Sequence, residues 1–485
     1  MKYKLERLNA YEIGRLVNKR IISPLEVVDY FIERINKRNP SINAFTYLKV
    51  EEARKEAKRI EERLNNHEDV GPFAGVPFAL KDFLPSKKGW NNSKGGVKSL
   101  VREDPISSVF CEAMEKAGGI AIGKCNAPSF GFSGLTYNKM YGLSKNPFNT
   151  LYNPGGSSGG SASAVADGLV IIAEGGDAGG SIRIPSSFCN LFGYKSSVGT
   201  IPSVIRPDAW SATHPYCCNG GLTKSVKETA ILLNYMAKYD PRDPLSIEKH
   251  IDYVKEMKKS IKGKRIAFTY DFDLFNTDQR IKDKLDEAKK KFEELGAIVE
   301  PIHFHFKHDK NYYAEVWCRS IVVDNVIELE LEKENGLDLL KDCQDELPKE
   351  FIYYINKSKN STVFDYYIFN VARTEIYDAF QDVFDKYDLI ISPISEVPPF
   401  RNDLKEKTYE SIKDNDNMMS WSETFLVNFT GHPAASIPLG LIDNLPVGMQ
   451  LIGKRFHDEE VLRFAYAYEK IAPWKKYYKI PLSRK

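Results

Sequence analysis

The sequence has little cysteine. Its 485 residues contain only 7 cysteines, and no two of them have the C-x-x-C spacing. Disulfide frameworks and structural zinc sites depend on closely spaced cysteines, so neither is predicted here. A low and odd number of cysteines fits a reducing compartment, and we expect a cytoplasmic protein.

The sequence also lacks a long apolar run and an excess of one charge. No stretch has the length needed to span a bilayer, and residues 1–31 carry charges throughout, without the apolar segment of a secretory signal. The 68 Lys and Arg residues nearly balance the 66 Asp and Glu residues, which leaves a net charge of +2. This balance gives no sign of a nucleic acid or an anionic membrane as partner. We expect a small-molecule substrate, and a homo-oligomer stays open.

The apolar residues follow two alternating patterns. Residues 8–38 have apolar side chains at helical spacing, whereas short apolar runs bounded by Gly, Pro and Asn begin near residue 71. Helical stretches separate these runs, which predicts an α/β fold with a mixed sheet covered by helices on both faces. We expect one domain over 1–485, whose parts are N-terminal helices (1–70), a catalytic core (71–240), a helical insertion or cap (about 305–385) and the C-terminal part of the core (386–485).

Two glycine clusters that contain serine stand close together, NPGGSSGGSASA at 153–164 and EGGDAGGSIR at 174–183. A phosphate-binding loop is one use of such glycines, but the nearest match, GGIAIGKC at 118–125, has Cys125 where Ser or Thr would meet the metal. That segment is better interpreted as a strand.

A nucleophile elbow is the second use of such glycines. Gly155, Ser157 and Gly159 satisfy G-x-S-x-G, but turn-forming residues rather than a strand precede them. His432 and His457 are the histidines that would serve as the base, and for each a structural or surface role is the stronger interpretation.

A metal site is the third possibility, because His303, His305 and His308 lie within six residues of one another in HFHFKH. The spacing fixes no carboxylate or thiolate partner for them. Solvated histidines at a strand end are the simpler interpretation, and we predict no metal.

Serine chemistry without histidine needs another base. A lysine serves when burial lowers its pKa, because desolvation penalises the charged ammonium form. Lys81 follows the apolar run AGVPFAL, which would carry it into the interior. A surface lysine with only its stem buried is the alternative that stays open.

The second glycine cluster offers consecutive backbone N–H groups at Ala178, Gly179, Gly180 and Ser181. Such groups can converge on the oxyanion of an acyl-transfer reaction, since glycine leaves no side chain in the way of a substrate carbonyl. An ordinary glycine-rich turn is the alternative. Asp177 and Arg183 flank this loop, where they either pair and brace it or face water.

The sequence resembles the amidase signature family over most of its length. The matching stretches are GPFAGVPFALKD (71–82), GKCNAPSFGF (123–132), NPGGSSGGSASAVADG (153–168), GGDAGGSIRIPSSFCNLFGYKSS (175–197), YDLIISPI (387–394), NFTGHPAASIPLG (428–440) and LPVGMQLIG (445–453). The resemblance implies an amide hydrolase with a single α/β/α domain around a mixed, twisted sheet and with no cofactor.

The resemblance also implies roles for particular residues. Ser181 would be the nucleophile and form an acyl-enzyme, Ser157 the bridging serine in a cis peptide, and Lys81 the base. Ala178, Gly179, Gly180 and Ser181 would form the oxyanion hole, Gly131 would line the acyl pocket, and Asp177 and Arg183 would support the loop.

Some positions depart from the family pattern. Many members have Thr where this sequence has Gly176, and Lys-Pro-Thr where it has Lys195, Ser196 and Ser197. Amidotransferase subunits of the family usually have Asn at the position of Phe83. The stretch GGDAGGS is more similar to members that hydrolyse aminohexanoate oligomers.

Two functions therefore stay open. One is a stand-alone amide hydrolase, in whose pocket Tyr312, Trp317 or Phe425 would take part if they are not simply core residues. The other is a glutamine-hydrolysing subunit of an amidotransferase complex.

Overall fold

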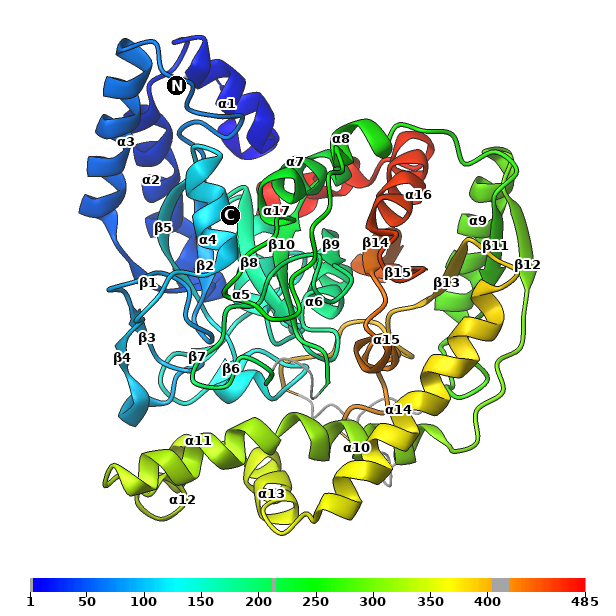
Figure 1. Ribbon diagram of the computed structural model, residues 1–485. Helices are drawn as coiled ribbons and strands as arrows, with labels where there is room; N and C mark the ends of the chain where they lie inside the picture. The colour runs from blue at the N-terminus through cyan, green and yellow to red at the C-terminus, as the bar shows by residue number, and fades with distance from the viewer. Residues whose placement is uncertain (1–2, 212–214, 404–417, 485) are drawn as a thin grey trace.

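A mixed β-sheet runs through the middle of the molecule (Figure 1). The computed structural model describes residues 3–211, 215–403 and 418–484, and within them this sheet has 11 strands. In spatial order they are β1 (Phe45–Leu48), β5 (Ile120–Cys125), β2 (Pro77–Lys81), β8 (Ile172–Asp177), β10 (Cys218–Thr223), β9 (Phe192–Lys195), β14 (Ala434–Ile442), β15 (Leu445–Gly453), β13 (Leu389–Pro393), β11 (Arg265–Phe268) and β12 (Ile298–Pro301). The predicted single α/β domain with a mixed sheet is confirmed.

Parallel pairing occurs in two parts of this sheet. Strand β2 runs parallel to both of its neighbours, β5 and β8, and β11 runs parallel to β12 and β13. Every residue of β2 and of β5 is buried, as expected for strands that are covered on both faces. Strand β5 covers most of the GGIAIGKC segment, so the strand interpretation of that segment is confirmed.

Helices cover the sheet (Figure 1). The helices packed on or around the sheet are α1 (Ala10–Asn18), α2 (Pro24–Ile42), α3 (Val50–Asn65), α4 (Val109–Lys116), α5 (Gly159–Ala166), α6 (Arg183–Phe188), α7 (Val226–Met236), α8 (Tyr253–Glu256), α9 (Gln279–Glu294), α15 (Phe425–Thr430), α16 (Asp458–Ile471) and α17 (Lys479–Ser483). Helices α5 and α6 begin directly after the two glycine clusters and contact each other. The sheet and these two helices therefore bring the two clusters together.

The sequence shows where several of these elements begin and end. The Ser23 hydroxyl accepts a hydrogen bond from the Glu26 N–H, the Glu26 carboxylate accepts one from the Ser23 N–H, and Pro24 starts helix α2. This reciprocal cap, with proline at the first helical position, is a strong signal for a helix start. The hairpin of β14 and β15 turns at Asp443 and Asn444, whose φ angles of 51° and 64° suit a tight two-residue turn.

A separate layer of helices lies below the sheet in Figure 1. It consists of α10 (Lys310–Ile321), α11 (Val323–Glu334), α12 (Leu339–Asp342), α13 (Lys349–Ser358) and α14 (Val363–Phe384). Many of its buried side chains belong to a second apolar cluster, which also includes Phe130 and Phe132 from the first half of the chain. The helical layer therefore packs on the loop that carries Gly131.

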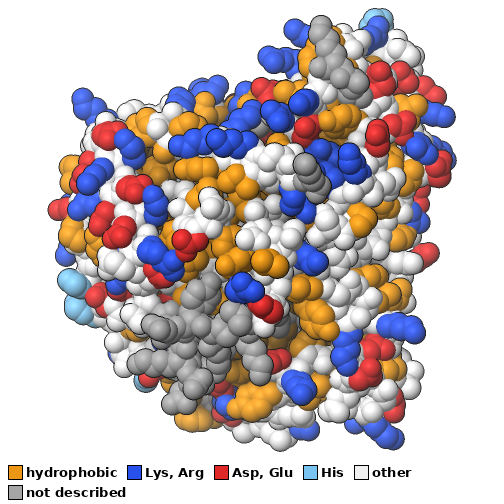
Figure 2. Space-filling view, turned by 180° about the vertical axis from the view of Figure 1, so that it is seen from behind, with side chains coloured by type: hydrophobic (Ala, Val, Ile, Leu, Met, Phe, Trp, Pro, Cys, Tyr) orange, Lys and Arg blue, Asp and Glu red, His pale blue; other side chains and the backbone are white. Residues whose placement is uncertain are grey.

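The molecular surface carries both charges. Figure 2 shows Lys and Arg side chains together with Asp and Glu side chains over the face in view. Within the described ranges, no helix combines the length and the apolar character needed to cross a bilayer. Two-stranded sheets form at the edge of the core from β3 (Asn91–Asn92) with β4 (Arg102–Glu103), and from β6 (Tyr137–Asn138) with β7 (Gly142–Leu143).

Candidate active site

Lys81 is the last residue of strand β2, and its side chain is only 4% exposed. Its Nζ atom donates a hydrogen bond to Oγ of Ser157 over 2.7 Å. Burial lowers the pKa of Lys81 to about 8, although the carboxylates of Asp177 and Glu174 oppose this effect. A large fraction of Lys81 is therefore neutral slightly above neutral pH, as a base requires.

Ser157 lies in the loop before helix α5 and is buried. The Gly156–Ser157 peptide is cis, as the family resemblance implies. The next residue, Ser158, donates its backbone N–H to the carbonyl of Ser181 over 3.2 Å. The two serine-bearing clusters are thus joined directly at Ser158 and Ser181.

Ser181 ends the loop that follows strand β8, and its side chain is partly exposed. The carbonyl groups before it are each held by a donor. Asn428 Nδ2 donates to the Asp177 carbonyl over 3.0 Å, Trp317 Nε1 to the Ala178 carbonyl over 2.9 Å, Thr424 Oγ1 to the Gly179 carbonyl over 2.6 Å, and the Ile184 N–H to the Gly180 carbonyl over 2.7 Å. In a trans peptide the N–H points away from the preceding carbonyl, so these four contacts fix the directions of the next four N–H groups.

One of these four N–H groups is already used. The Gly180 N–H donates to Oδ1 of Asp177 over 2.8 Å. This differs from the expectation that all four N–H groups face the oxyanion, because the side chain of Asp177 folds back under the loop and takes this one. Ala178, Gly179 and Ser181 remain as the candidate donors.

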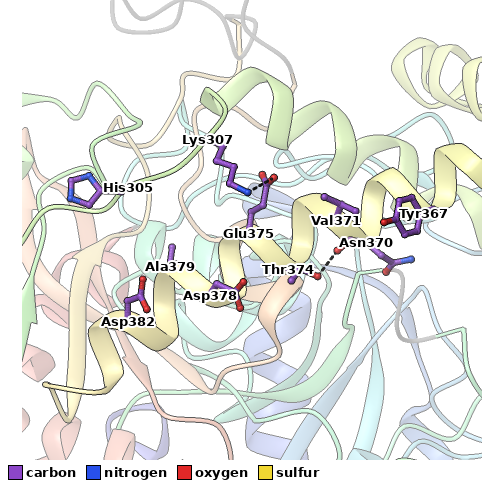
Figure 3. Close-up of a pocket in the computed structure, with 10 residues that line it drawn as sticks. All are labelled: His305, Lys307, Tyr367, Asn370, Val371, Thr374, Glu375, Asp378, Ala379 and Asp382. Carbon is purple, nitrogen blue, oxygen red and sulfur yellow. Dashed lines mark hydrogen bonds and ion pairs between the residues drawn. The ribbon is translucent and has the colours of Figure 1, made fainter.

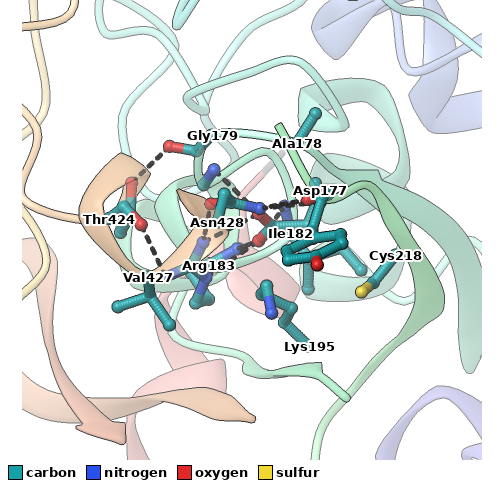
Figure 4. Close-up of polar contacts among 12 residues, drawn as sticks. Asp177, Ala178, Gly179, Ile182, Arg183, Lys195, Cys218, Thr424, Val427 and Asn428 are labelled. Atoms are coloured by element: carbon teal, nitrogen blue, oxygen red, sulfur yellow. Dashed lines mark hydrogen bonds and ion pairs between the residues drawn. The ribbon is translucent and has the colours of Figure 1, made fainter. Parts of the chain in front are cut away.

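Asp177 and Arg183 form a fully buried ion pair beneath the loop (Figure 4). The Nη2 atom of Arg183 lies 2.8 Å from Oδ1 of Asp177, and Nε lies 2.9 Å from Oδ2. Burial alone would raise the pKa of the Asp177 carboxyl, but the Arg183 guanidinium outweighs burial and holds that pKa well below its usual range. Arg183 also contacts the Thr424 carbonyl and the side chains of Asn428 and Gln450, so this pair connects the loop to helix α15 and strand β15.

Gly131 approaches Ser157 closely. A Cβ atom placed on Gly131 would lie 3.3 Å from Oγ of Ser157 and 3.1 Å from the ring of Phe83. The φ angle of Gly131 is +65°, which disfavours any other residue there. The ring of Phe83 lies 5.3 Å from Nζ of Lys81, so Lys81, Phe83, Gly131 and Ser157 are neighbours.

Comparison with known proteins then identifies the family. A family model described as amidase matches residues 26–462. The chain belongs to the amidase family. This amidase is therefore a hydrolase that acts on amide C–N bonds.

Similar proteins agree with this assignment. A bacterial aryl acylamidase of the amidase signature enzymes superposes with a TM-score of 0.95 at 35% identity, over 99% of each chain. A 6-aminohexanoate cyclic dimer hydrolase with bound substrate superposes with a TM-score of 0.85 at 25% identity, over 97% of this chain and 98% of the other. A glutamyl-tRNA(Gln) amidotransferase subunit of Geobacillus stearothermophilus is 32% identical over 483 residues, which cover 96% of this chain and 97% of that protein.

The histidines considered from the sequence lie elsewhere in the amidase. His432 is buried and contacts Thr430 and Gln381. Burial holds the pKa of His432 well below its usual value, so its ring is neutral. His457 is mostly exposed and lies 3.5 Å from Glu459. Neither histidine contacts Ser157 or Ser181 among the hydrogen bonds of the described residues.

The HFHFKH histidines lie near a groove of about 510 Å³ along helix α14 (Figure 3). His305 lines this groove, His303 lies 2.9 Å from Asp273, and His308 lies 3.6 Å from Glu375. In the described part of the chain, no group of three or more His, Cys, Asp or Glu side chains is arranged to hold a metal ion. Lys81, Ser157 and Ser181 do not line the groove.

The three aromatic residues considered for the pocket differ in position. Tyr312 stacks on His308 with ring centroids 3.9 Å apart, and Phe425 is buried between Phe275 and Phe429. Of the three, Trp317 is the one that contacts the loop before Ser181. Sequence reasoning missed Thr424, Asn428 and Glu174, although Asn428 opens the NFTGHPAASIPLG stretch of the family resemblance and offered a signal.

Proposed function

We propose that this amidase cleaves a carboxamide through an acyl-Ser181 intermediate, with Lys81 as the base and Ser157 as the proton relay. The observation that carries the proposal is the 2.7 Å contact between the buried amine of Lys81 and the hydroxyl of Ser157. A buried lysine with a lowered pKa is a competent base, and a serine hydroxyl can accept and donate a proton at once.

The proposed acylation step moves one proton twice. Oγ of Ser181 attacks the substrate carbonyl while its proton passes to Oγ of Ser157, and the Ser157 proton passes to Nζ of Lys81. When the C–N bond breaks, the proton returns along the same path to the leaving amine. Water then attacks the acyl-Ser181 ester by the same relay and releases the carboxylic acid.

The loop before Ser181 would stabilise the negative oxygen formed in this step. The N–H groups of Ala178, Gly179 and Ser181 are held in fixed directions by the contacts made to the preceding carbonyls. Donors that are already oriented need no reorganisation when the oxyanion develops. Their role as an oxyanion hole is supported by this arrangement, and the buried Asp177–Arg183 pair would keep the loop in place.

A glutamine-hydrolysing amidotransferase subunit is the second candidate. The 32% identity to the subunit of Geobacillus stearothermophilus supports it. The higher TM-score and identity of the aryl acylamidase support the first candidate, and so does the apolar ring of Phe83 beside Lys81 and Gly131.

Hydrolysis assays on the purified chain separate the two candidates. We expect the chain alone to hydrolyse simple aryl or alkyl amides, and the Ser181→Ala variant to lose this activity. Activity on glutamine that arises only with a partner subunit, without activity on simple amides, would support the second candidate instead. Undiminished activity of the Ser181→Ala variant would overturn the mechanism.

A further inference from the structure

We infer that Trp317 is a positioning residue that connects the helical layer α10–α14 to the loop before Ser181. The inference rests on the proposed function, since it assigns a catalytic consequence to that loop. It goes further by naming a residue, far away in the sequence, through which the helical layer influences the chemical step.

The indole of Trp317 makes two kinds of contact with the loop. Its Nε1 atom donates to the Ala178 carbonyl over 2.9 Å. Its ring lies against Gly179, because a Cβ atom on Gly179 would come within 2.4 Å of Cζ2 and 2.7 Å of Cε2. Trp317 thus fixes both the direction of the 178–179 peptide and the space beside it.

The 178–179 peptide matters because its N–H belongs to Gly179. With the Ala178 carbonyl held by the indole, the Gly179 N–H must point the opposite way. The Gly180 N–H is occupied by Asp177, so fewer donors remain for an oxyanion and the orientation of Gly179 carries more weight. Losing this hydrogen bond would free the peptide to rotate.

Trp317 reaches the loop from the helical layer. It lies in helix α10, is 5% exposed, and stacks on Phe132 with ring centroids 6.3 Å apart. Phe132 in turn contacts Phe351 and Tyr354 of helix α13. The other two side chains that hold the loop carbonyls, Thr424 and Asn428, come from the start of α15 and from α15 itself. Trp317 is therefore the contact made by the helical layer.

The test replaces the hydrogen bond while keeping the bulk. In Trp317→Phe the ring still packs against Gly179 and Phe132, but the N–H donor is gone. We expect the maximal rate of labelling by an alkyl fluorophosphonate to fall about tenfold, because the phosphonyl oxygen uses the same donors as an oxyanion. The concentration that gives half-maximal rate should change by less than about twofold.

Trp474 offers a matched control. It is 2% exposed, lies in the 3₁₀ helix Trp474–Tyr478, and donates its indole N–H to the Lys224 carbonyl over 2.9 Å. Trp474→Phe removes a hydrogen bond of the same kind and length, and Lys224 follows the end of β10 away from Asp177. We expect this variant to lose stability like Trp317→Phe and to keep the wild-type labelling rate.

The outcomes separate the inference from the proposed function. Equal labelling rates in Trp317→Phe and Trp474→Phe would overturn the inference, whereas labelling of Ser181→Ala at the wild-type rate would overturn the proposed function. If Trp317→Phe does not fold, benzothienylalanine at position 317 keeps the shape of indole and removes only the N–H. A wild-type labelling rate with that residue would likewise overturn the inference.

Discussion

The backbone N–H of Lys81 donates to Oε2 of Glu174 over 3.2 Å, across the neighbouring strands β2 and β8. The other oxygen of Glu174 accepts a hydrogen bond from the Ser108 hydroxyl over 2.6 Å. Burial raises the pKa of the Glu174 carboxyl to about 7, although its hydrogen bonds oppose the shift. A titrating carboxyl group therefore lies beside the lysine proposed as the base.

The first prediction concerns the pH dependence of activity. Only neutral Lys81 can accept a proton, and its pKa is lowered to about 8 by burial. kcat/KM for a neutral amide should therefore rise with pH below about 8 and level off above it. A pH profile between 6 and 10, measured on an amide without ionisable groups, tests this. A rate that is flat or falls over this range would rule out Lys81 as the base.

The second prediction concerns Glu174→Gln. The Glu174 carboxylate stabilises the ammonium form of Lys81, so removing its charge should lower the pKa of Lys81 and shift the acid limb of the profile to lower pH. The amide oxygen of Gln can still accept from Lys81 N–H or Ser108. Glu112→Gln, which removes an exposed partner of Arg242, serves as the control and should leave the profile unchanged. A shift to higher pH in the Glu174 variant would contradict the prediction.

The third prediction concerns Gly131. Gly131→Ala adds a Cβ that meets the Ser157 hydroxyl and the Phe83 ring, so we expect at least about tenfold lower kcat/KM, which corresponds to about 1.4 kcal/mol.

Gly89→Ala is the matched control for Gly131→Ala. Gly89 has a similar φ of +78°, but its added Cβ meets nothing within 4 Å. Both variants should lose about 1 to 2 kcal/mol of stability from the left-handed backbone, measured by urea unfolding. If both kept full activity, Gly131 would have no place in the site.

The fourth prediction concerns the buried ion pair. Arg183→Met leaves the carboxylate of Asp177 buried without its cation, and we expect a loss of about 3 to 5 kcal/mol in the free energy of unfolding. Arg401→Met removes one partner of an exposed pair with Asp403 and should cost less than about 1 kcal/mol. Urea unfolding at pH 7 measures both, and equal losses would refute the bracing role of Arg183.

The sequence predicted the local parts of the site better than the long-range ones. Asp177 and Arg183 are 6 residues apart, and their flanking positions around a glycine-rich loop made their pairing one of two stated possibilities. Lys81 could be placed in the interior because an apolar strand sequence leads directly to it.

The contacts that hold the loop carbonyls were beyond reach. Trp317, Thr424 and Asn428 are 139, 245 and 251 residues away from the carbonyls they hold. Helical spacing shows that Trp317 is on a buried face, but it does not show which neighbour that face meets. The use of the Gly180 N–H by Asp177 was equally hidden, since it depends on how the loop folds back on its own side chain.

Labelling with a fluorophosphonate, followed by peptide mapping, tests the central claim most directly, because it reports which hydroxyl the buried amine activates. We predict a single phosphonyl group on Ser181, none on Ser181→Ala, and labelling slowed by at least about a hundredfold in Lys81→Met. A label on another residue, or labelling of Lys81→Met at the wild-type rate, would contradict the account.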